Sequence, residues 1–435
     1  MADAAVRIGL VGLGTIGTGV LRLLQENERS LETKLGFSLR LDRIADIDLE
    51  TDRGVSLDPY RLSRDWRELV DDPELDLIVE LIGGTGVARE IALATLAAGK
   101  GLVTANKALL ASRGDDIWAQ AAQAGCDIGF EASVAGTVPV LRALREGLCA
   151  DRIESVHGIV NGTCNFILCE MEALGESYAA CLKRAQKLGY AEPDPSFDVN
   201  GMDSTHKLVI LAGLAFGARV TPADVPTEGI EDVTPADIDF ARRLGLRIKL
   251  LAIAKERDGA IEARVHPTMV PQSSVLARVD GPMNAVEVRG RMSGPTLYYG
   301  AGAGALPTAS AVVADLMELA RSLRCGARRR VPPLGRTELR DLQVRPRADL
   351  EGEYYLRFSA LDRPGVLSRI AGALGEQGVS LASVLQLERA VQEAVPVVMM
   401  THPAKEAALR RALREIDRMG EIAAPTRVIP IEREL

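Results

Sequence analysis

A glycine-rich segment between a predicted strand and a predicted helix constrains the fold of this chain most. Residues 6–11 form a short apolar run, and residues 15–25 repeat apolar side chains at helical spacing. Three glycines, Gly12, Gly14 and Gly17, lie where the strand passes into the helix. The first permits a tight turn, and the second lets the backbone approach a pyrophosphate. The third lets the helix pack closely on the strand. The sequence therefore predicts a dinucleotide at the helix N-terminus, contacted by Gly12, Gly14, Thr15, Ile16 and Gly17.

Strands and helices alternate over the first third of the chain. The apolar runs and helical patterns follow one another at 39–45, 75–82, 87–98, 102–105 and 108–124. Such alternation predicts right-handed βαβ units around a parallel sheet. We therefore expect an α/β fold with an N-terminal Rossmann domain at residues 1–132, completed by a helix at 308–323.

The remaining chain divides into three predicted parts. Residues 133–307 are expected to form an α+β domain, with a helix from about Asp203 to Phe216, and the family resemblance given below implies that this domain is the catalytic and dimerisation domain. Residues 326–352 hold seven arginines and three prolines, which is typical of an exposed linker. Residues 353–430 have the element order βαββαβ, which predicts a ferredoxin-like domain.

The charge balance narrows the possible partners. Acidic residues outnumber basic ones by 60 to 52, for a formal charge of −8, so the chain lacks the basic footprint of nucleic-acid binding. The N-terminus has no signal-peptide pattern, and the apolar run at 6–13 is too short to span a membrane. We expect no nucleic-acid or membrane partner, reduced cysteines and a cytoplasmic location.

Asp46, at the end of the second predicted strand, is the candidate acceptor for the ribose hydroxyls of the cofactor. A carboxylate there repels a 2′-phosphate and so favours NAD over NADP. Asp46 lies farther from Gly17 than the usual spacing of about 20 residues. The alternative is an ordinary loop carboxylate.

Two lysines are candidates for the chemistry. Asp203 and Lys207 are one helix turn apart, and the apolar run at 208–212 that follows predicts a largely buried helix. A lysine beside such a core lines a cleft and can act as general acid or base, although an exposed ion pair is the alternative. Lys107 follows a strand at the edge where parallel sheets bind ligands, or else merely starts a helix.

Longer motifs resemble those of the homoserine dehydrogenase family over nearly the whole chain. The matching stretches are GLGTIG at 12–17, TANKALLA at 104–111, EASVAGTVPV at 131–140, NGTCNFIL at 161–168, GYAEPDPSFDVNGMDSTHK at 189–207 and GAGAGALPTASAVVADL at 300–316. The stretch at 189–207 is highly specific for that family. Residues 361–374 and 378–386 resemble the ACT domain, an amino-acid-sensing module often fused to this enzyme.

The resemblance implies a reversible reduction of L-aspartate 4-semialdehyde to L-homoserine with NADP or NAD, in threonine, methionine and isoleucine biosynthesis. Lys207 is then the acid that protonates the nascent alkoxide, and Lys107 assists beside the nicotinamide. Glu192 binds the substrate ammonium group, together with Asp203 and Asp198. The further residues implied at the cofactor are Gly83, Gly189 and Gly304.

The resemblance also implies a monovalent cation, sodium, held by Glu131 and the backbone carbonyls of Val134, Gly136 and Val138. One carboxylate and three backbone oxygens suit a hard cation. Many relatives carry a histidine in the segment that here spans 272–276, which has none. We therefore assign no catalytic histidine there, and His206 is the only histidine expected near the cleft.

In the ACT unit, Asp362, Gly365 and Val366 would form a strand–helix turn whose free amides bind an amino-acid carboxylate. The resemblance implies threonine as inhibitor and a homodimer or homotetramer. A purely structural dimerisation domain is the alternative.

Two other functions remain open. Aspartate-semialdehyde dehydrogenase needs a nucleophilic cysteine, and Cys126 and Cys149 lack a catalytic context. A cofactor-binding sensor without turnover would not need the set of Lys107, Glu192, Asp203 and Lys207.

Overall fold

The computed structural model describes residues 5–386 and 393–435. The chain folds into two compact units. The first comprises residues up to 162, 203–225 and 282–342, and the second comprises 163–202, 226–281 and 343–435. These limits differ from the domain boundaries expected from the sequence, which stay predictions.

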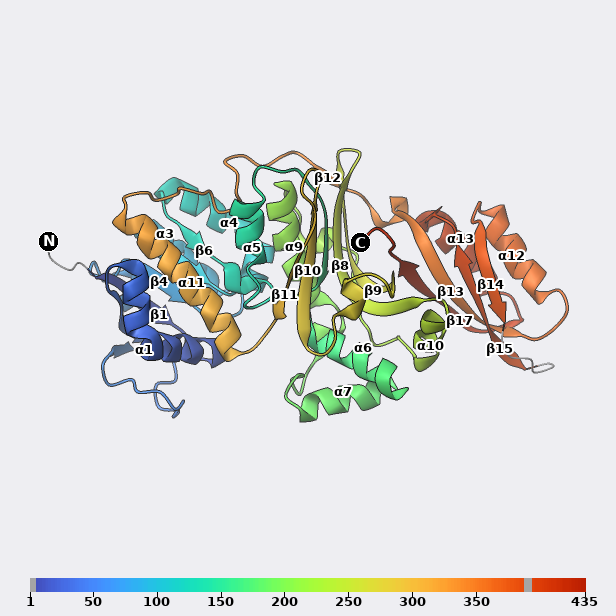
Figure 1. The fold of residues 1–435 in the computed structure, drawn as a ribbon, viewed down its shortest axis with the longest axis horizontal. Coiled ribbons are helices and arrows are strands. Elements are labelled where there is room, and N and C mark those ends of the chain that lie inside the picture. Colours follow the sequence, from blue (N-terminus) through green and yellow to red (C-terminus); the bar gives the residue numbers. More distant parts are fainter. Residues whose placement is uncertain (1–4, 387–392) are drawn as a thin grey trace. The chain divides into compact units, whose positions relative to one another are not determined.

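The first unit contains a six-stranded sheet in the order β3-β2-β1-β4-β5-β6, with every pair parallel (Figure 1). The strands are β1 (Val6–Val11), β2 (Leu39–Ala45), β3 (Arg61–Ser63), β4 (Leu77–Glu80), β5 (Gly101–Thr104) and β6 (Ile128–Gly129). This is the strand order of a Rossmann fold, so the predicted α/β class is confirmed.

Helices pack on this sheet because each has one apolar face. They are α1 (Thr15–Leu35), α2 (Arg67–Val70), α3 (Val87–Ala97), α4 (Lys107–Ala124) and α11 (Ala305–Arg324). Helices α1 and α11 lie together (Figure 1), and their apolar residues share one core with Ile8 and Leu10 of β1. Gly36 caps the C-terminus of α1, and its left-handed φ of 77° lets its N–H donate to the Glu32 carbonyl in the last turn.

The rest of the first unit is irregular helix, one long helix and an antiparallel sheet. The helical segments are η1 (Glu131–Ser133), α5 (Val140–Arg142), the π-helical η2 (Ala143–Gly147), α9 (Met202–Phe216) and η3 (Pro222–Asp224). The strands β7 (Ile153–Ile159), β10 (Met283–Gly290) and β11 (Gly294–Ala301) pair antiparallel. Helix α9 confirms the helix predicted from Asp203 to Phe216.

The second unit combines helices with a β-hairpin and a ferredoxin-like module. The first part contains α6 (Gly162–Leu174), α7 (Tyr178–Lys187), α8 (Ser196–Val199), α10 (Pro235–Arg243), β8 (Leu246–Arg257), β9 (Ala260–Pro271) and η4 (Leu276–Arg278). The later elements are β12 (Gln343–Val344), η5 (Arg347–Asp349), β13 (Glu351–Leu361), α12 (Val366–Glu376), β14 (Leu381–Gln386), β15 (Ala394–Thr401), β16 (Ala404–Lys405), α13 (Glu406–Ile416) and β17 (Ile422–Ile431).

The ferredoxin-like module has the sheet order β17-β13-β15-β14, as βαββαβ predicts. Leu356 and Phe358 of β13 share a core with Ile370 of α12 and Leu409 of α13, so both helices cover one face. Strand β17 also pairs in parallel with β9 at Ile431 and Met269. The module is therefore joined by backbone pairing to the β8–β9 hairpin.

The segment at 326–352, predicted to be an exposed linker, is exposed or half-buried except at Leu350, and it also makes specific ion pairs. Arg345 pairs with Glu262 at 2.9 Å, and Arg347 pairs with Glu406 at 2.5 Å. Both carboxylates are almost fully buried, and a buried charge requires a partner. The arginine-rich composition therefore reflects specific ion pairs as well as solvation. No helix in the described part of the chain combines the length and apolarity needed to cross a membrane.

Candidate active site

The glycine loop after β1 has the shape that a pyrophosphate requires. Gly12 has a φ of +102°, and a Cβ there would lie 2.8 Å from the Leu81 carbonyl group. A Cβ on Gly17 would lie 1.9 Å from the Gly12 oxygen, so neither position accepts a side chain. Outside the chain neighbours of Gly14, no described atom lies within 4 Å of a Cβ built on it. Gly14 is the N-cap of α1 and offers no capping side chain, so N–H groups of the first turn face that space.

Asp46 follows β2 and is half-buried beside this loop. Its carboxylate accepts hydrogen bonds from the backbone N–H of Leu13 and, at 2.8 Å, from that of Asp48. Asp46 thus ties the glycine loop to the end of β2, and its contact with ribose stays a prediction. Gly83 has a φ of 73° and Gly304, the N-cap of α11, a φ of 121°. Both glycines are exposed, and their cofactor roles also stay predictions.

Asp203 joins the two lysines predicted from the sequence. The Lys107 Nζ lies 3.0 Å from Asp203 Oδ1, and the Lys207 Nζ lies 2.7 Å from Asp203 Oδ2. Lys207 also donates to the carbonyl of Val160 at 2.6 Å. Asn161 donates its amide to Asp203 Oδ2 at 2.8 Å. Lys107, Asp203 and Lys207 therefore form one polar cluster within the first unit.

The cluster is buried on one side and open on the other. Asp203 and Lys207 are 3% and 8% exposed, whereas the Lys107 side chain is 34% exposed. Burial by itself would raise the pKa of Asp203, but the ammonium groups of Lys207 and Lys107 hold it well below its usual range. Asp203 stays ionised at neutral pH. Two lysines around one carboxylate are an arrangement that suits stabilising or protonating a developing alkoxide.

Local structure explains why these side chains meet. The apolar residues of α9 bury that helix, and Asp203 and Lys207 occupy successive turns on one of its faces. Lys107 is the first residue of α4, and the N-cap Asn106 accepts the N–H of Leu109 at 3.0 Å. Burial lowers the pKa of His206, the ammonium of Lys107 acts in the same direction, and Asp203 opposes it. His206 therefore interacts electrostatically with both Asp203 and Lys107.

Sequence reasoning did not single out three polar residues near the cluster. They are Glu80, Asn106 and Asn161, all nine-tenths or more buried. Each lies at or just beyond the end of a strand, at the edges where β4, β5 and β7 finish. A polar residue directly after a buried strand was the signal that could have found them.

The predicted substrate residues Glu192 and Asp198 belong to the second unit. Glu192 is exposed, and its carbonyl accepts the Gln186 amide at 3.2 Å. Asp198 lies in α8, and its carbonyl accepts the Cys164 thiol at 3.3 Å. Gly189, in the same unit, has a φ of 77°. Their contacts with substrate and cofactor stay predictions.

Glu131 lies in η1 with a nearly buried carboxylate. Its oxygens accept the backbone N–H groups of Leu141 at 2.9 Å and Arg142 at 2.8 Å. Burial, assisted by the neighbouring Asp315, raises the pKa of Glu131 to about 7. Between Glu131 and Leu141 the chain passes through Ala135 and Gly136, which both have a left-handed backbone, with φ of 55° and 56°. A left-handed alanine is a strained conformation of the kind found at ligand sites.

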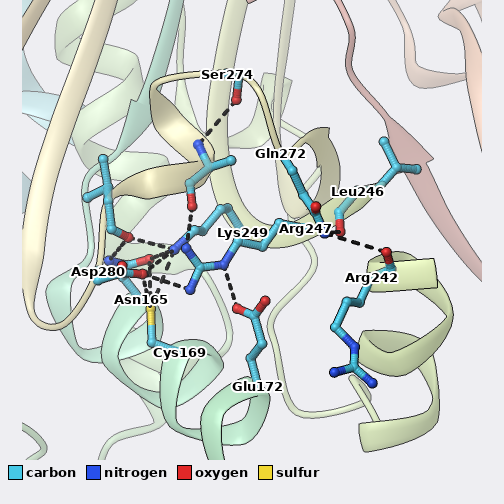
Figure 2. Close-up of polar contacts among 12 residues, drawn as sticks. Asn165, Cys169, Glu172, Arg242, Leu246, Arg247, Lys249, Gln272, Ser274 and Asp280 are labelled. Atoms are coloured by element: carbon cyan, nitrogen blue, oxygen red, sulfur yellow. Dashed lines mark hydrogen bonds and ion pairs between the residues drawn. The ribbon is translucent and has the colours of Figure 1, made fainter. Parts of the chain in front are cut away.

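Hydrogen bonds hold the segment at 272–276, where no catalytic histidine was assigned, to neighbouring parts of the chain (Figure 2). Gln272 donates to the Leu246 carbonyl at 3.2 Å, and Ser274 accepts the N–H of Ala277 at 3.2 Å. Nearby, the buried Lys249 donates to Asn165 and to the carbonyl of Val279. These contacts fix the chain on either side of η4.

The predicted effector turn joins β13 to α12 in the second unit. Gly365 is the N-cap of α12 with a φ of 90°, and Val366 is the first helical residue. Asp362 donates its N–H to the Glu393 carbonyl at 2.9 Å, and its buried Oδ2 has no partner among the described residues. The turn thus combines a helix N-terminus with a buried carboxylate oxygen that has no partner among the described residues. Within residues 5–386 and 393–435, no group of three His, Cys, Asp or Glu side chains is arranged to hold a metal ion.

Three family models match the chain in succession. Residues 12–131 match "Homoserine dehydrogenase, NAD binding domain", residues 139–317 match "Homoserine dehydrogenase", and residues 354–421 match "ACT domain". The chain is 43% identical over 429 residues to a homoserine dehydrogenase from Neisseria gonorrhoeae, covering 98% of each chain.

Solved structures give the same result. A homoserine dehydrogenase from Thiobacillus denitrificans is 43% identical with a TM-score of 0.94, over 99% of this chain and 98% of that one. A hyperthermophilic archaeal homoserine dehydrogenase in complex with NADPH is 26% identical with a TM-score of 0.62, over 74% of this chain and 98% of that one. These likenesses favour homoserine dehydrogenase over both alternatives, the cysteine-dependent dehydrogenase and the sensor without turnover.

Proposed function

The chain belongs to the homoserine dehydrogenase family, and from that premise we propose that Lys207, Asp203 and Lys107 carry its oxidoreductase chemistry. The substrates of the family are L-homoserine and L-aspartate 4-semialdehyde, and the first part of the chain is an NAD(P)-binding domain. The observation that supports this assignment is the sharing of one buried carboxylate by two lysines.

In the proposed mechanism Lys207 moves the proton. When bound, the nicotinamide supplies the hydride for the aldehyde carbon of the semialdehyde. Lys207 then donates a proton to the alkoxide oxygen, and takes it back in the oxidation of homoserine. Asp203 and the Val160 carbonyl accept hydrogen bonds of 2.7 and 2.6 Å from the Lys207 ammonium, and these bonds fix the position of its Nζ. Lys107 adds a second positive charge that stabilises the alkoxide.

Substrate binding is proposed to involve three carboxylates. Asp203 lies in the polar cluster, while Glu192 and Asp198 come from the segment that follows α7. A carboxylate such as Glu192, exposed and acceptor-only, suits the ammonium group of an amino acid.

The cofactor is proposed to lie on the glycine loop, with Gly12, Gly14, Thr15, Ile16 and Gly17 at the pyrophosphate and Gly83, Gly189 and Gly304 along its length. Asp46 favours NAD by repelling a 2′-phosphate. The archaeal relative in complex with NADPH supports use of NADP within the same family. We therefore propose that the protein uses either NAD or NADP. The ratio of the homoserine oxidation rates with the two cofactors measures which one it prefers.

A monovalent cation is proposed at Glu131 with the carbonyls of Val134, Gly136 and Val138. The residues fit such an ion because the Glu131 carboxylate is 7% exposed and two backbone N–H groups already hold it in place. Sodium would compensate a charge that burial disfavours.

Regulation is proposed to act through the ACT domain, which implies an amino-acid effector. Threonine, an end product in the biosynthesis of threonine, methionine and isoleucine, is the proposed inhibitor. The N-terminus of α12 at Gly365 and Val366 would bind its carboxylate, and the orphaned oxygen of Asp362 would bind its ammonium. A homodimer or homotetramer is also proposed, because edge strand β11 leaves Leu297 and Tyr299 exposed.

An initial-rate assay of the purified full chain tests the proposed reaction. We expect reduction of NAD or NADP that depends on L-homoserine, and a lower rate when threonine is added. If the protein oxidised homoserine neither with NAD nor with NADP, the proposed reaction would be contradicted. Turnover unaffected by threonine would contradict only the proposed effector.

A further inference from the structure

Glu80, the last residue of β4, is a fully buried carboxyl group at the sheet edge that faces the proposed cofactor. Its Oε1 accepts the N–H of Ile82 at 2.9 Å, and its Oε2 accepts the Thr104 hydroxyl at 2.7 Å. Burial raises the pKa of Glu80, and these hydrogen bonds oppose that effect. A carboxyl group is costly to bury, so its position at a site edge requires a reason beyond packing.

The first arm of contacts from Glu80 supports the turn after β4. Ile82 precedes Gly83 and Gly84, which have φ values of 73° and 72° and no described atom within 4 Å of a built Cβ outside their chain neighbours. Leu81, between Glu80 and Ile82, donates its N–H to Val11 at 2.8 Å and packs against Gly12. Glu80 therefore holds a turn that touches the glycine loop.

The second arm runs to the helix that begins with Lys107. The Thr104 hydroxyl, which donates to Glu80, accepts the N–H of Asn106 at 3.0 Å. The Asn106 side chain caps α4 through Leu109 and donates its amide to the Gly84 carbonyl at 2.7 Å. The two arms meet at Gly84 and close a ring of hydrogen bonds with Glu80 at its base.

We propose that Glu80 is a positioning residue that fixes the Gly83–Gly84 turn and the start of α4 as one body, and so sets Lys107 against Asp203. This inference rests on the proposed function, because it takes Gly83 as a cofactor contact and Lys107 as an active-site lysine. Glu80 touches neither substrate nor cofactor in this proposal. It acts through Thr104, Asn106 and the backbone of Ile82.

A double-mutant cycle tests the Lys107 arm. Glu80→Gln keeps the size of the side chain but replaces one carboxylate oxygen with an NH₂ group. That group cannot accept a hydrogen bond, so either the Ile82 N–H or the Thr104 hydroxyl loses its acceptor. We expect Glu80→Gln to lower kcat by about tenfold, since small misplacements of active-site groups cost about 10- to 100-fold. In a Lys107→Met background, the same change should alter kcat by less than about twofold, because the effect passes through Lys107. An equal tenfold loss in both backgrounds would mean a merely structural role and would overturn the proposal.

The dissociation constant of NADPH, followed by its fluorescence, tests the turn arm. Glu80→Gln should weaken NADPH binding in both backgrounds, because this arm does not pass through Lys107. Unchanged affinity would overturn that half of the proposal. If Lys107→Met itself kept the wild-type kcat, the proposed role of Lys107 would fail together with the first arm, while the NADPH measurement would still decide the second.

Thr104 gives a second route with a matched control. Thr104→Val removes the hydroxyl between Glu80 and Asn106, and should reproduce the loss of kcat seen in Glu80→Gln. Thr104→Ser restores the hydroxyl and should recover most of kcat. Thr95→Val removes another buried hydroxyl, in α3, that has no partner among the described residues, and should leave kcat unchanged. Equal losses in Thr95→Val and Thr104→Val would contradict the specific role of the ring.

Discussion

At the level of single residues, the main feature of the site is that the carboxylate of Asp203 contacts two lysines. Each carboxylate oxygen contacts one lysine, at 3.0 Å for Lys107 and 2.7 Å for Lys207. Removing one lysine leaves a neutral pair, while removing Asp203 leaves two repelling cations partly shielded from water. The Asp203 carboxylate is therefore the common partner that holds both lysines at one place.

Glu131 leads to a prediction about pH and sodium. The ordinary pKa of 4.5 is raised to about 7 in the folded protein, mainly by burial. Between these values the folded state holds a proton that the unfolded state has released, so stability falls as pH rises from 4.5 to about 7. At 1.36 kcal/mol per pKa unit, the loss is about 3 kcal/mol. A bound sodium ion would offset it.

Urea unfolding at pH 5 and pH 7.5, in sodium chloride or choline chloride at equal ionic strength, measures this effect. We expect sodium to raise the unfolding midpoint at pH 7.5 and to have little effect at pH 5. In Glu131→Gln the sodium effect should vanish at both pH values. A sodium effect of equal size at both pH values would argue against Glu131 as the ligand.

At the level of elements, a buried ion pair joins α10 to β13. Asp237 is fully buried in the capping box of α10 and accepts hydrogen bonds from Arg357 at 2.7 and 3.1 Å and from Tyr355 at 3.2 Å. Breaking a buried pair leaves an uncompensated charge. We expect Asp237→Asn to reduce the free energy of unfolding by about 3 kcal/mol.

A control for that substitution lies on the same helix. Asp239 pairs with Arg242 and Arg243, but all three side chains are exposed. Asp239→Asn should therefore cost less than about 1 kcal/mol. Denaturant midpoints of the two variants compare them directly, and equal losses would refute the importance of the α10–β13 contact.

Elements with strong local signals were predictable from the sequence. The buried run of β1, the glycines after it and the apolar face of α9 each fix their structure through nearby residues, and all three are present in the fold. Asp237 and Arg347 were not predicted, because the partners of their ion pairs, Arg357 and Glu406, lie far away in the chain. A buried charge is informative only when the residue that neutralises it is known, and one sequence does not show that pairing.

In the candidate site, too, the contacts between residues close in sequence were predictable, and those that depend on tertiary packing were not. Lys207 and Asp203 are four residues apart on one helix, so helical geometry alone brings them together. The meeting of Lys107 with Asp203 depends on tertiary packing, and it was expected only through the family resemblance. The carbonyl of Val160 has no sequence signal, because any residue supplies a backbone oxygen.

At the level of the molecule, the ACT module is part of the second unit. Strand β17 pairs with β9, and beyond it Glu432 accepts hydrogen bonds from the buried Lys255 at 2.6 Å. Deleting the module would leave Lys255 without its buried partner and remove the arginine that faces Asp237. Truncation therefore tests stability as well as regulation, and a point substitution is the sharper experiment.

Asp362→Ala provides that experiment for the proposed effector turn. Loss of its carboxylate removes the proposed acceptor for the threonine ammonium group, and we expect sensitivity to threonine to fall by about tenfold or more, the loss of one charge-assisted hydrogen bond. Glu376→Ala removes an exposed carboxylate near the end of α12 and should leave sensitivity unchanged. Inhibition constants from initial rates compare the two, and unchanged inhibition in Asp362→Ala would place the effector elsewhere.

The most direct test of the central claim, that Lys207 moves the proton, is the kcat of Lys207→Met measured beside its cofactor affinity. The control is Lys183→Met, which removes an exposed lysine of α7. We predict that Lys207→Met lowers kcat by about 100-fold or more, as expected for loss of a general acid, while NADPH affinity changes little. Lys183→Met should match the wild type in both quantities. A Lys207→Met variant that kept near wild-type kcat would contradict the account.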